Sequence, residues 1–218
     1  MGYVLRLYQE EEEGTINNPR EWDNVGTMVC WHNRYDLGDH HCNASPRDFL
    51  ENLAYEIDQK TQAQLESQYY EDTIMTEKDY MNALMEVIQQ GAYILPLYLY
   101  DHSGITMNTS GFSCPWDSGQ VGWIYMTYDT AQKEHFNEQE AINCLNGEVE
   151  CYDQYISGEV YGYQIVETDE EGNEIDYVGG CTGFYGNDME ENGMIESIQD
   201  EGYEVEIPYT KTYQYILY

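Results

Sequence analysis

The chain has 218 residues, of which 8 are basic and 42 are acidic, so its formal net charge is −34. This charge disfavours binding to DNA, RNA or an anionic membrane, because their phosphates would be repelled. Aromatic residues make up 14% of the chain, enough to build a core, so we expect a folded protein rather than a disordered one.

The first elements combine two strands and a helix. Residues 3–9 and 25–35 alternate in the manner of strands and are rich in β-branched and aromatic residues. Ser45 is a good helix cap and Pro46 suits the first helical position, and apolar residues then recur at helical spacing as far as Ile57. We expect a helix to begin at Pro46.

The middle of the chain predicts a second helix and two more strands. Thr76 can cap a helix that Gly91 stops. Residues 93–100 are the most apolar stretch, and Pro96 within them indicates a bulge or a sheet edge. Residues 121–128 form a further strand candidate.

The last third predicts a helix, a hairpin, a short helix and a terminal strand, over residues 138–156, 159–178, 187–200 and 213–218. Together these elements indicate an α+β fold with a mostly antiparallel sheet flanked by about three helices. We expect residues 1–130 to form the scaffold. Residues 131–218 would form an acidic helix–hairpin–helix elaboration packed on the same domain.

Cysteine and histidine gather in one segment, at Cys30, His32, His40, His41 and Cys42. Zinc sites usually pair their ligands as Cys-x2-4-Cys or His-x3-5-His, and neither spacing occurs here. We therefore interpret this cluster as structural and predict no metal site.

A thiol or metal-dependent enzyme centred on His32, His102, Cys114 and Asp117 is the alternative that the sequence leaves open. A Cys–His pair needs spatial proximity, which spacing alone does not supply. The loop 110–119, which carries Trp116, is either functional or a connection with Trp116 folded back. We assign no catalytic residue.

Cofactor motifs are also missing. Neither GxxxxGK[ST] nor GxGxxG occurs, so nucleotide cofactors are disfavoured. Residues 169–174 are rich in carboxylates but lack the EF-hand spacing, and a hairpin turn accounts for them. We predict no cofactor. No apolar run approaches 18 residues and the first residues do not resemble a signal peptide, so we expect a cytoplasmic protein.

The acidic run is the main functional signal. Residues 134–206 hold 21 acidic residues and no Lys or Arg. Such a surface repels itself, so keeping it suggests a use: solubility, cation binding, or imitation of the phosphate field of DNA. The candidate partner-binding residues are acids of this run with two tyrosines as interface anchors: Glu138, Glu140, Glu148, Glu150, Asp153, Glu159, Glu167, Asp169, Glu170, Glu171, Glu174, Asp176, Tyr161 and Tyr177.

Three stretches resemble a family of phage and mobile-element proteins of low-GC Gram-positive bacteria. They are residues 19–32 (PREWDNVGTMVCWH), residues 94–106 (ILPLYLYDHSGIT) and residues 114–122 (CPWDSGQVG). The resemblance covers roughly residues 1–130 and carries no catalytic residue over. It implies an accessory protein of a phage, plasmid or prophage that acts in the host cytoplasm, a setting in which acidic anti-restriction and anti-CRISPR DNA mimics occur.

The sequence therefore favours a non-enzymatic inhibitor that binds a basic, nucleic-acid-binding host protein of the restriction or CRISPR effector type. The two other interpretations are the enzyme described above and an accessory protein whose charge only keeps it soluble. We expect no direct binding to nucleic acid or membrane, and the sequence leaves a homodimer open.

Overall fold

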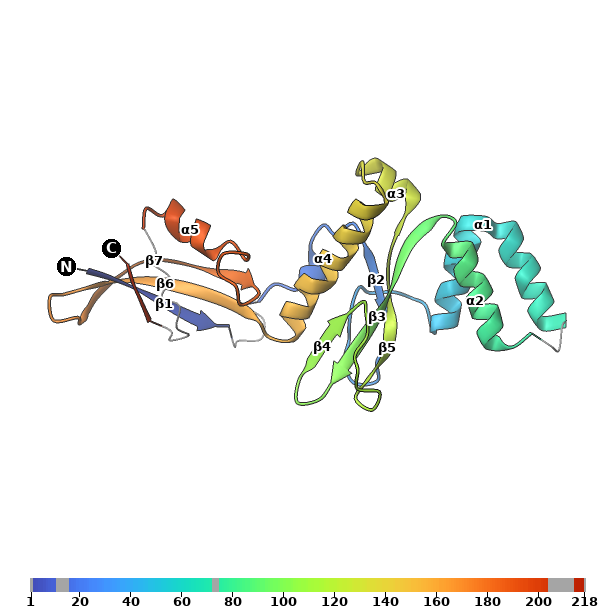
Figure 1. The fold of residues 1–218 in the computed structure, drawn as a ribbon, viewed down its shortest axis with the longest axis horizontal. Coiled ribbons are helices and arrows are strands. Elements are labelled where there is room, and N and C mark those ends of the chain that lie inside the picture. The colour runs from blue at the N-terminus through green and yellow to red at the C-terminus, as the bar shows by residue number, and fades with distance from the viewer. Residues whose placement is uncertain (1, 11–15, 72–74, 204–213, 218) are drawn as a thin grey trace. The chain divides into compact units, whose positions relative to one another are not determined.

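The computed structural model describes residues 2–10, 16–71, 75–203 and, for the backbone, 214–217 (Figure 1). Its α+β class and antiparallel pairing agree with the sequence prediction, but the strands form two sheets rather than one. The chain divides into two compact units, Met1–Pro19 with Cys151–Tyr218, here the terminal unit, and Arg20–Glu150, here the central unit. This division differs from the expected boundary at residue 130, because the first strand pairs with a strand that begins at Val160.

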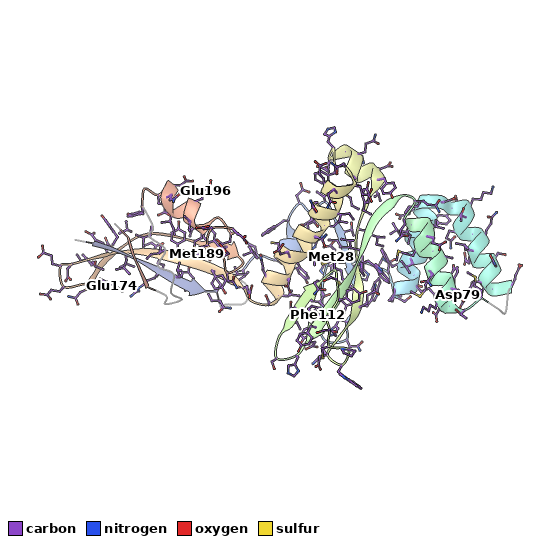
Figure 2. All side chains as sticks on the ribbon, viewed as in Figure 1. Met28, Asp79, Phe112, Glu174, Met189 and Glu196 are labelled. Carbon is purple, nitrogen blue, oxygen red and sulfur yellow. The ribbon has the colours of Figure 1, made fainter. Side chains whose placement is uncertain are left out.

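The terminal unit contains an antiparallel sheet in the order β7-β6-β1-β8. Its strands are β1 (Gly2–Gln9), β6 (Val160–Thr168), β7 (Glu174–Tyr185) and β8 (Gln214–Leu217). Leu5 and Ile165 are direct partners across β1 and β6, and both are fully buried. The short helix α5 (Met194–Asp200) covers this face, because Met194 and Ile198 belong to the same buried cluster. Figure 2 labels Met189, which packs against that cluster, and Glu196 on α5.

Helix α5 is shorter than the predicted helix 187–200. The carboxylate of Asp188 accepts hydrogen bonds from the backbone N–H groups of Glu190 and Glu191, which fixes a turn instead of a helix. Gly193 then takes a left-handed conformation with φ of 82°, which is open to glycine, and the helix begins after it.

The sheet of the central unit has the order β2-β5-β3-β4. Its strands are β2 (Thr27–Cys30), β5 (Ser118–Thr127), β3 (Ala92–Asp101) and β4 (Ile105–Asn108). Strand β4 pairs with β3 only from Tyr98 onward, so Pro96 lies where β3 is an edge, and the pairing shifts register just after it. Both expectations for Pro96 are therefore confirmed. The segment 25–35 gives only a short strand, because Gly38 returns to pair with Val29.

Helices cover one face of this sheet. Val29 of β2 and Trp123 of β5 are direct partners and pack against the helices α1 (Pro46–Glu71) and α2 (Glu77–Ile88). Helix α2 begins with the expected capping box, in which Thr76 and Asp79 exchange bonds with each other's backbone N–H.

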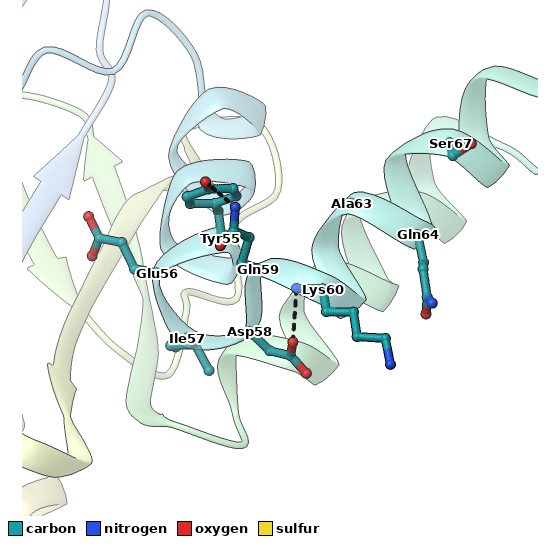
Figure 3. Close-up of a pocket in the computed structure, with 9 residues that line it drawn as sticks. All are labelled: Tyr55, Glu56, Ile57, Asp58, Gln59, Lys60, Ala63, Gln64 and Ser67. Atoms are coloured by element: carbon teal, nitrogen blue, oxygen red, sulfur yellow. Dashed lines mark hydrogen bonds between the residues drawn. The ribbon is translucent and has the colours of Figure 1, made fainter.

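Helix α1 is bent at Asp58, whose backbone leaves the helical region (φ −145°, ψ 86°). Its carboxylate caps the second half by accepting bonds from the N–H groups of Lys60 and Thr61 (Figure 3). A hydrogen bond from the Thr61 hydroxyl has the largest effect in lowering the pKa of Asp58, and these two backbone bonds lower it further. A shallow hollow of about 1,000 Å³ follows this bend. The Asp58 carboxylate in this hollow already caps the second half of α1, so we assign no chemistry to the hollow.

The remaining helices are η1 (Pro19–Glu21), α3 (Tyr128–Lys133) and α4 (Glu138–Ile156). Asn137 and Glu140 exchange hydrogen bonds with each other's backbone, which confirms Asn137 as the cap of α4. Leu145 of α4 and Ile124 of β5 both lie within about 3.1 Å of the Cβ position that Gly26 lacks. A side chain at Gly26 would therefore collide with both.

Candidate functional site

The hairpin formed by β6 and β7 concentrates negative charge at its tip. Residues 167–176 contain six carboxylates. Glu167 and Asp176 are direct cross-strand partners, so their side chains project to the same side of the sheet. Glu170 and Glu171 are exposed in the turn. Like charges placed directly opposite one another are destabilising, so this arrangement costs folding free energy.

The turn itself depends on one of these acids. The Asp169 carboxylate accepts hydrogen bonds from the Asn173 side chain (3.0 Å) and from the backbone N–H groups of Asn173 (2.8 Å) and Glu171 (2.9 Å). These bonds lower the pKa of Asp169, the bond from the Asn173 side chain having the largest effect, and so favour the ionised form of this carboxylate. Gly172 supplies the positive φ of 84° that closes the loop.

Basic residues are rare in the terminal unit. Its sequence holds 20 acidic residues and only two basic ones, Arg6 and Lys211. Arg6 of β1 forms an ion pair with Glu174, which lies at the base of the turn and is labelled in Figure 2. Both side chains are 48% exposed, so water screens this pair and it offsets only part of the local charge.

Large apolar side chains are exposed beside these acids. Ile175, Tyr177 and Val178 on β7 are 54%, 59% and 44% exposed. The pairing between β6 and β7 shifts register near this point, between Ile165 and Val166. Exposed apolar groups surrounded by charge resemble the anchor and rim of a protein interface.

Two groups of the other predicted acids and one predicted tyrosine lie elsewhere. Glu138, Glu140 and Glu150 are exposed on α4 within the central unit, although Glu140 also completes the cap. Asp153 and Glu159 are half-buried in the terminal unit. Tyr161 of the predicted anchors packs against the buried cluster rather than facing solvent.

The set of candidate partner-binding residues did not include the acids within and around α5. Exposed carboxylates occur there at Asp188, Glu190, Glu191, Glu196, Asp200 and Glu201. The Tyr163 hydroxyl donates to Glu201 (2.7 Å), and burial together with this bond raises the pKa of Tyr163 to about 12. The signal was present in the sequence, because these residues lie in the same cation-free run.

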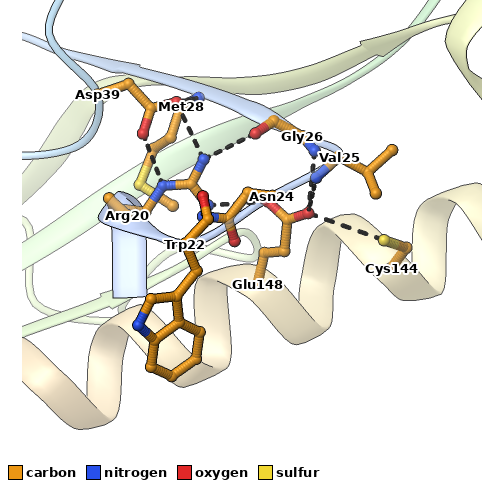
Figure 4. Close-up of polar contacts among 9 residues, drawn as sticks. All are labelled: Arg20, Trp22, Asn24, Val25, Gly26, Met28, Asp39, Cys144 and Glu148. Carbon is orange, nitrogen blue, oxygen red and sulfur yellow. Dashed lines mark hydrogen bonds and ion pairs between the residues drawn. The ribbon is translucent and has the colours of Figure 1, made fainter. Parts of the chain in front are cut away.

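The position of Glu148 differs from the prediction that it belongs to the partner-binding surface. Its side chain is 12% exposed and its Oε2 accepts a hydrogen bond from Arg20 (2.8 Å), whose side chain is 2% exposed (Figure 4). Its Oε1 accepts the backbone N–H groups of Val25 and Gly26, both at 2.9 Å. Glu148 therefore fastens α4 to the segment before β2 and is removed from the candidate interface.

Arg20 is held from several sides. Asp39 receives two of its N–H groups (2.8 and 2.9 Å), and the Gly26 carbonyl receives another (2.7 Å). Burial lowers the pKa of Arg20, but the bonds to Asp39 and Glu148 outweigh it and the pKa is raised. The buried charges are therefore compensated, as buried ion pairs require.

A second feature of the central unit is the pocket beside Trp116. It measures about 440 Å³ and is lined by residues from three parts of the chain, among them His32, Arg34, Asp101, Trp116 and Asp117. The Trp116 side chain is 91% exposed, which contradicts the alternative in which it folds back onto the protein.

Of the four residues of the alternative enzyme hypothesis, His32 and Asp117 line this pocket, and Cys114 and His102 lie beside Asp117. The Cys114 thiol donates to Asp117 Oδ2 (3.4 Å), and His102 Nδ1 lies 3.8 Å from the same oxygen. The carboxylate therefore lies between thiol and imidazole. A reactive cysteine is typically activated by a hydrogen-bonded imidazole or by a nearby positive charge, whereas the hydrogen-bond partner of Cys114 is a carboxylate.

The Cys30–Cys42 segment makes structural contacts. His41 Nε2 lies 3.0 Å from the Cys30 carbonyl oxygen, and its ring packs against Trp31. Burial raises the pKa of Cys30 to about 12, while Cys42 is exposed. Within residues 2–10, 16–71 and 75–203, no group of three His, Cys, Asp or Glu side chains is arranged to hold a metal ion.

Comparison with family models, with curated proteins and with solved structures finds no match for this chain. Among the helices of the described residues, none combines the length and the apolar character needed to cross a membrane.

Proposed function

We propose that this protein is a non-enzymatic anti-defence inhibitor of phage type. Its acidic β6–β7 hairpin, residues 167–178, would occupy the nucleic-acid-binding groove of a basic host protein. The observation that carries the proposal is the joint exposure of carboxylates and apolar anchors on one hairpin.

The charge density of the hairpin supports a DNA-like field. Its six carboxylates lie on the two strands and the turn, within the last four residue positions of the hairpin counted from the Glu167–Asp176 pair to the tip. Four positions span about 13 Å at the usual rise of a strand, which gives roughly one charge per 2 Å. Subtracting the carboxylate that Arg6 engages leaves about one per 2.6 Å. B-DNA carries about one per 1.7 Å of its axis.

The exposed apolar residues would lengthen the lifetime of a complex, which charge alone does not do. Electrostatic attraction speeds the encounter of opposite surfaces, whereas buried aromatic contacts set how long a complex lasts. Tyr177 stands next to Asp176 and is the most exposed of the three apolar residues on β7. A DNA-binding groove with an apolar wall would bury this ring, while its basic residues meet the carboxylates.

The enzyme alternative has weaker support. Cys114 donates to Asp117, and no imidazole is a hydrogen-bond partner of Cys114 among the contacts of the described residues. The pocket therefore lacks the thiol–base geometry of a cysteine nucleophile. The solubility alternative predicts that the position of the acids does not matter, and the experiment below separates it from the decoy.

The test uses lysate of a low-GC Gram-positive host that carries restriction or CRISPR systems. Its DNA-binding proteins are loaded on DNA–cellulose, and the purified protein is added to release them. The hairpin variant carries Glu170→Gln, Glu171→Gln and Asp176→Asn. The control carries Glu56→Gln, Glu66→Gln and Glu86→Gln, three exposed acids of α1 and α2. Both variants have the same net charge, and both leave the Arg6 pair and the Asp169 turn intact.

We expect the wild type and the control to release the same specific proteins. An exposed ion pair is worth about 0.5 kcal/mol, so losing three raises the concentration for half release about tenfold in the hairpin variant. Equal losses in both variants would favour bulk charge over a defined site. Undiminished release by the hairpin variant would refute the proposal.

A further inference from the structure

The pocket beside Trp116 lies in the central unit and is separate from the acidic hairpin. We propose that it is a second recognition site, which binds an arginine side chain presented by a basic protein. This inference does not depend on the decoy function, because it concerns different residues and has its own test.

The charges of the pocket favour a cation. Arg34 forms an ion pair with Asp101, so these two lining residues compensate each other. The carboxylate of Asp117, 39% exposed, remains as the local charge. Anionic ligands are disfavoured both by this carboxylate and by the net charge of −34.

The Trp116 indole favours a planar cation over other cationic ligands of the pocket. Trp116 follows the Cys114–Pro115 turn and exposes 91% of its surface next to Asp117. A guanidinium stacks on an indole face and bonds a carboxylate through its fork of N–H groups at the same time. Arg34 shows a version of this arrangement, since its guanidinium pairs with Asp101 and lies 5.5 Å from the centre of the Tyr35 ring.

The loop that presents Trp116 is ordered before any ligand arrives. The Asp101 N–H donates to the Asp117 carbonyl oxygen (2.8 Å), and the Ser118 hydroxyl donates to the Cys114 carbonyl oxygen. The Cys114 thiol fixes the Asp117 carboxylate from one side. A site held in this way loses little conformational entropy on binding.

The size of the pocket agrees with this ligand. Its volume of about 440 Å³ lies within the range of roughly 300–1,000 Å³ that is typical of ligand sites. It also adjoins His102, whose Nδ1 lies 3.8 Å from Asp117 Oδ2.

The test is a titration of the full chain with N-acetylarginine amide, followed by the NMR signals of the indole N–H groups. All four tryptophans lie in the central unit; Trp31 and Trp116 line the pocket, whereas Trp22 and Trp123 do not line it. We expect saturable shifts of the Trp116 indole and of the backbone of residues 117–120. The neutral isostere N-acetylcitrulline amide should cause no such shifts.

Variants make the assignment specific. Trp116→Ala and Asp117→Asn should each weaken binding about tenfold, as read from the backbone signals of residues 118–120. Trp22→Ala removes another exposed tryptophan, 48% exposed, and should leave binding unchanged. Equal shifts with the citrulline compound, or arginine shifts spread over residues 167–178 with none in the pocket, would overturn the proposal. The hairpin variant should still bind arginine here, so failure of the decoy function remains distinguishable.

Discussion

The buried network around Arg20 gives the sharpest stability prediction. Glu148→Ala removes one carboxylate partner of Arg20 and the acceptor of two backbone N–H groups. Removing one partner of a buried ion pair costs about 3–5 kcal/mol, because the other charge is left uncompensated. We therefore expect the central unit to lose about 4 kcal/mol of unfolding free energy.

Urea unfolding followed by tryptophan fluorescence measures this loss. The four tryptophans all lie within residues 20–150, so the signal reports on the central unit. With a slope of about 2 kcal/mol per molar urea, the midpoint should fall by about 2 M. Glu148→Gln keeps an acceptor oxygen but removes the charge, and its midpoint should lie between those of the wild type and Glu148→Ala.

The matched control is Glu150→Ala. Glu150 is exposed two residues farther along the same helix, and its loss changes the net charge by the same amount. Its effect should stay within about 0.5 kcal/mol. If Glu148→Ala and Glu150→Ala shift the midpoint equally, the buried network does not hold α4 in place and the reasoning fails.

Four further predictions concern charge, thiols and caps. Asp176→Asn removes the repulsion with Glu167 and should stabilise the terminal unit by about 0.5 kcal/mol at low salt, and by less at about 0.5 M salt. Thermal unfolding followed by tyrosine absorbance measures this gain, and a loss of stability would contradict the cross-strand pairing. A thiol reagent at pH 8 should modify exposed Cys42 and Cys181 quickly and Cys30 last. The folded-state pKa of Cys30 is raised to about 12, so on raising the pH its thiol ionises in the unfolded state before it ionises in the folded state. This difference lowers the free energy of unfolding as the pH rises above about 8.5. Cys30→Ala should flatten this alkaline loss of stability, and an unchanged slope would argue against a buried thiol. Thr76→Ala should cost the central unit about 1 kcal/mol in the urea assay, and no change would mean that the capping box does not stabilise α2.

Much of the fold was predictable because its signals are local. The caps at Thr76 and Asn137 act within one helical turn, so residues three positions apart reveal them. The two-unit division was not predictable, because it depends on β1 pairing with β6 across about 160 residues. Nothing local in residues 2–9 reveals that partner.

The candidate site shows the same limit. The sequence indicated that the run 134–206 is acidic, but the exposure of each acid depends on tertiary contacts. Glu148 and Glu150 are alike in sequence, yet only Glu148 meets Arg20, which lies 128 positions away. The convergence of His32, Asp101 and Trp116 on one pocket likewise needs the sheet to bring three distant segments together.

The most direct test of the decoy is competition. A host protein released from DNA–cellulose is purified, and its affinity for a labelled DNA duplex is measured by fluorescence anisotropy at increasing concentrations of this protein. A DNA mimic should raise the apparent Kd for DNA in proportion to its own concentration, without forming a ternary complex, and added salt should weaken the effect steeply. A ternary complex with an unchanged Kd for DNA would contradict the proposed function.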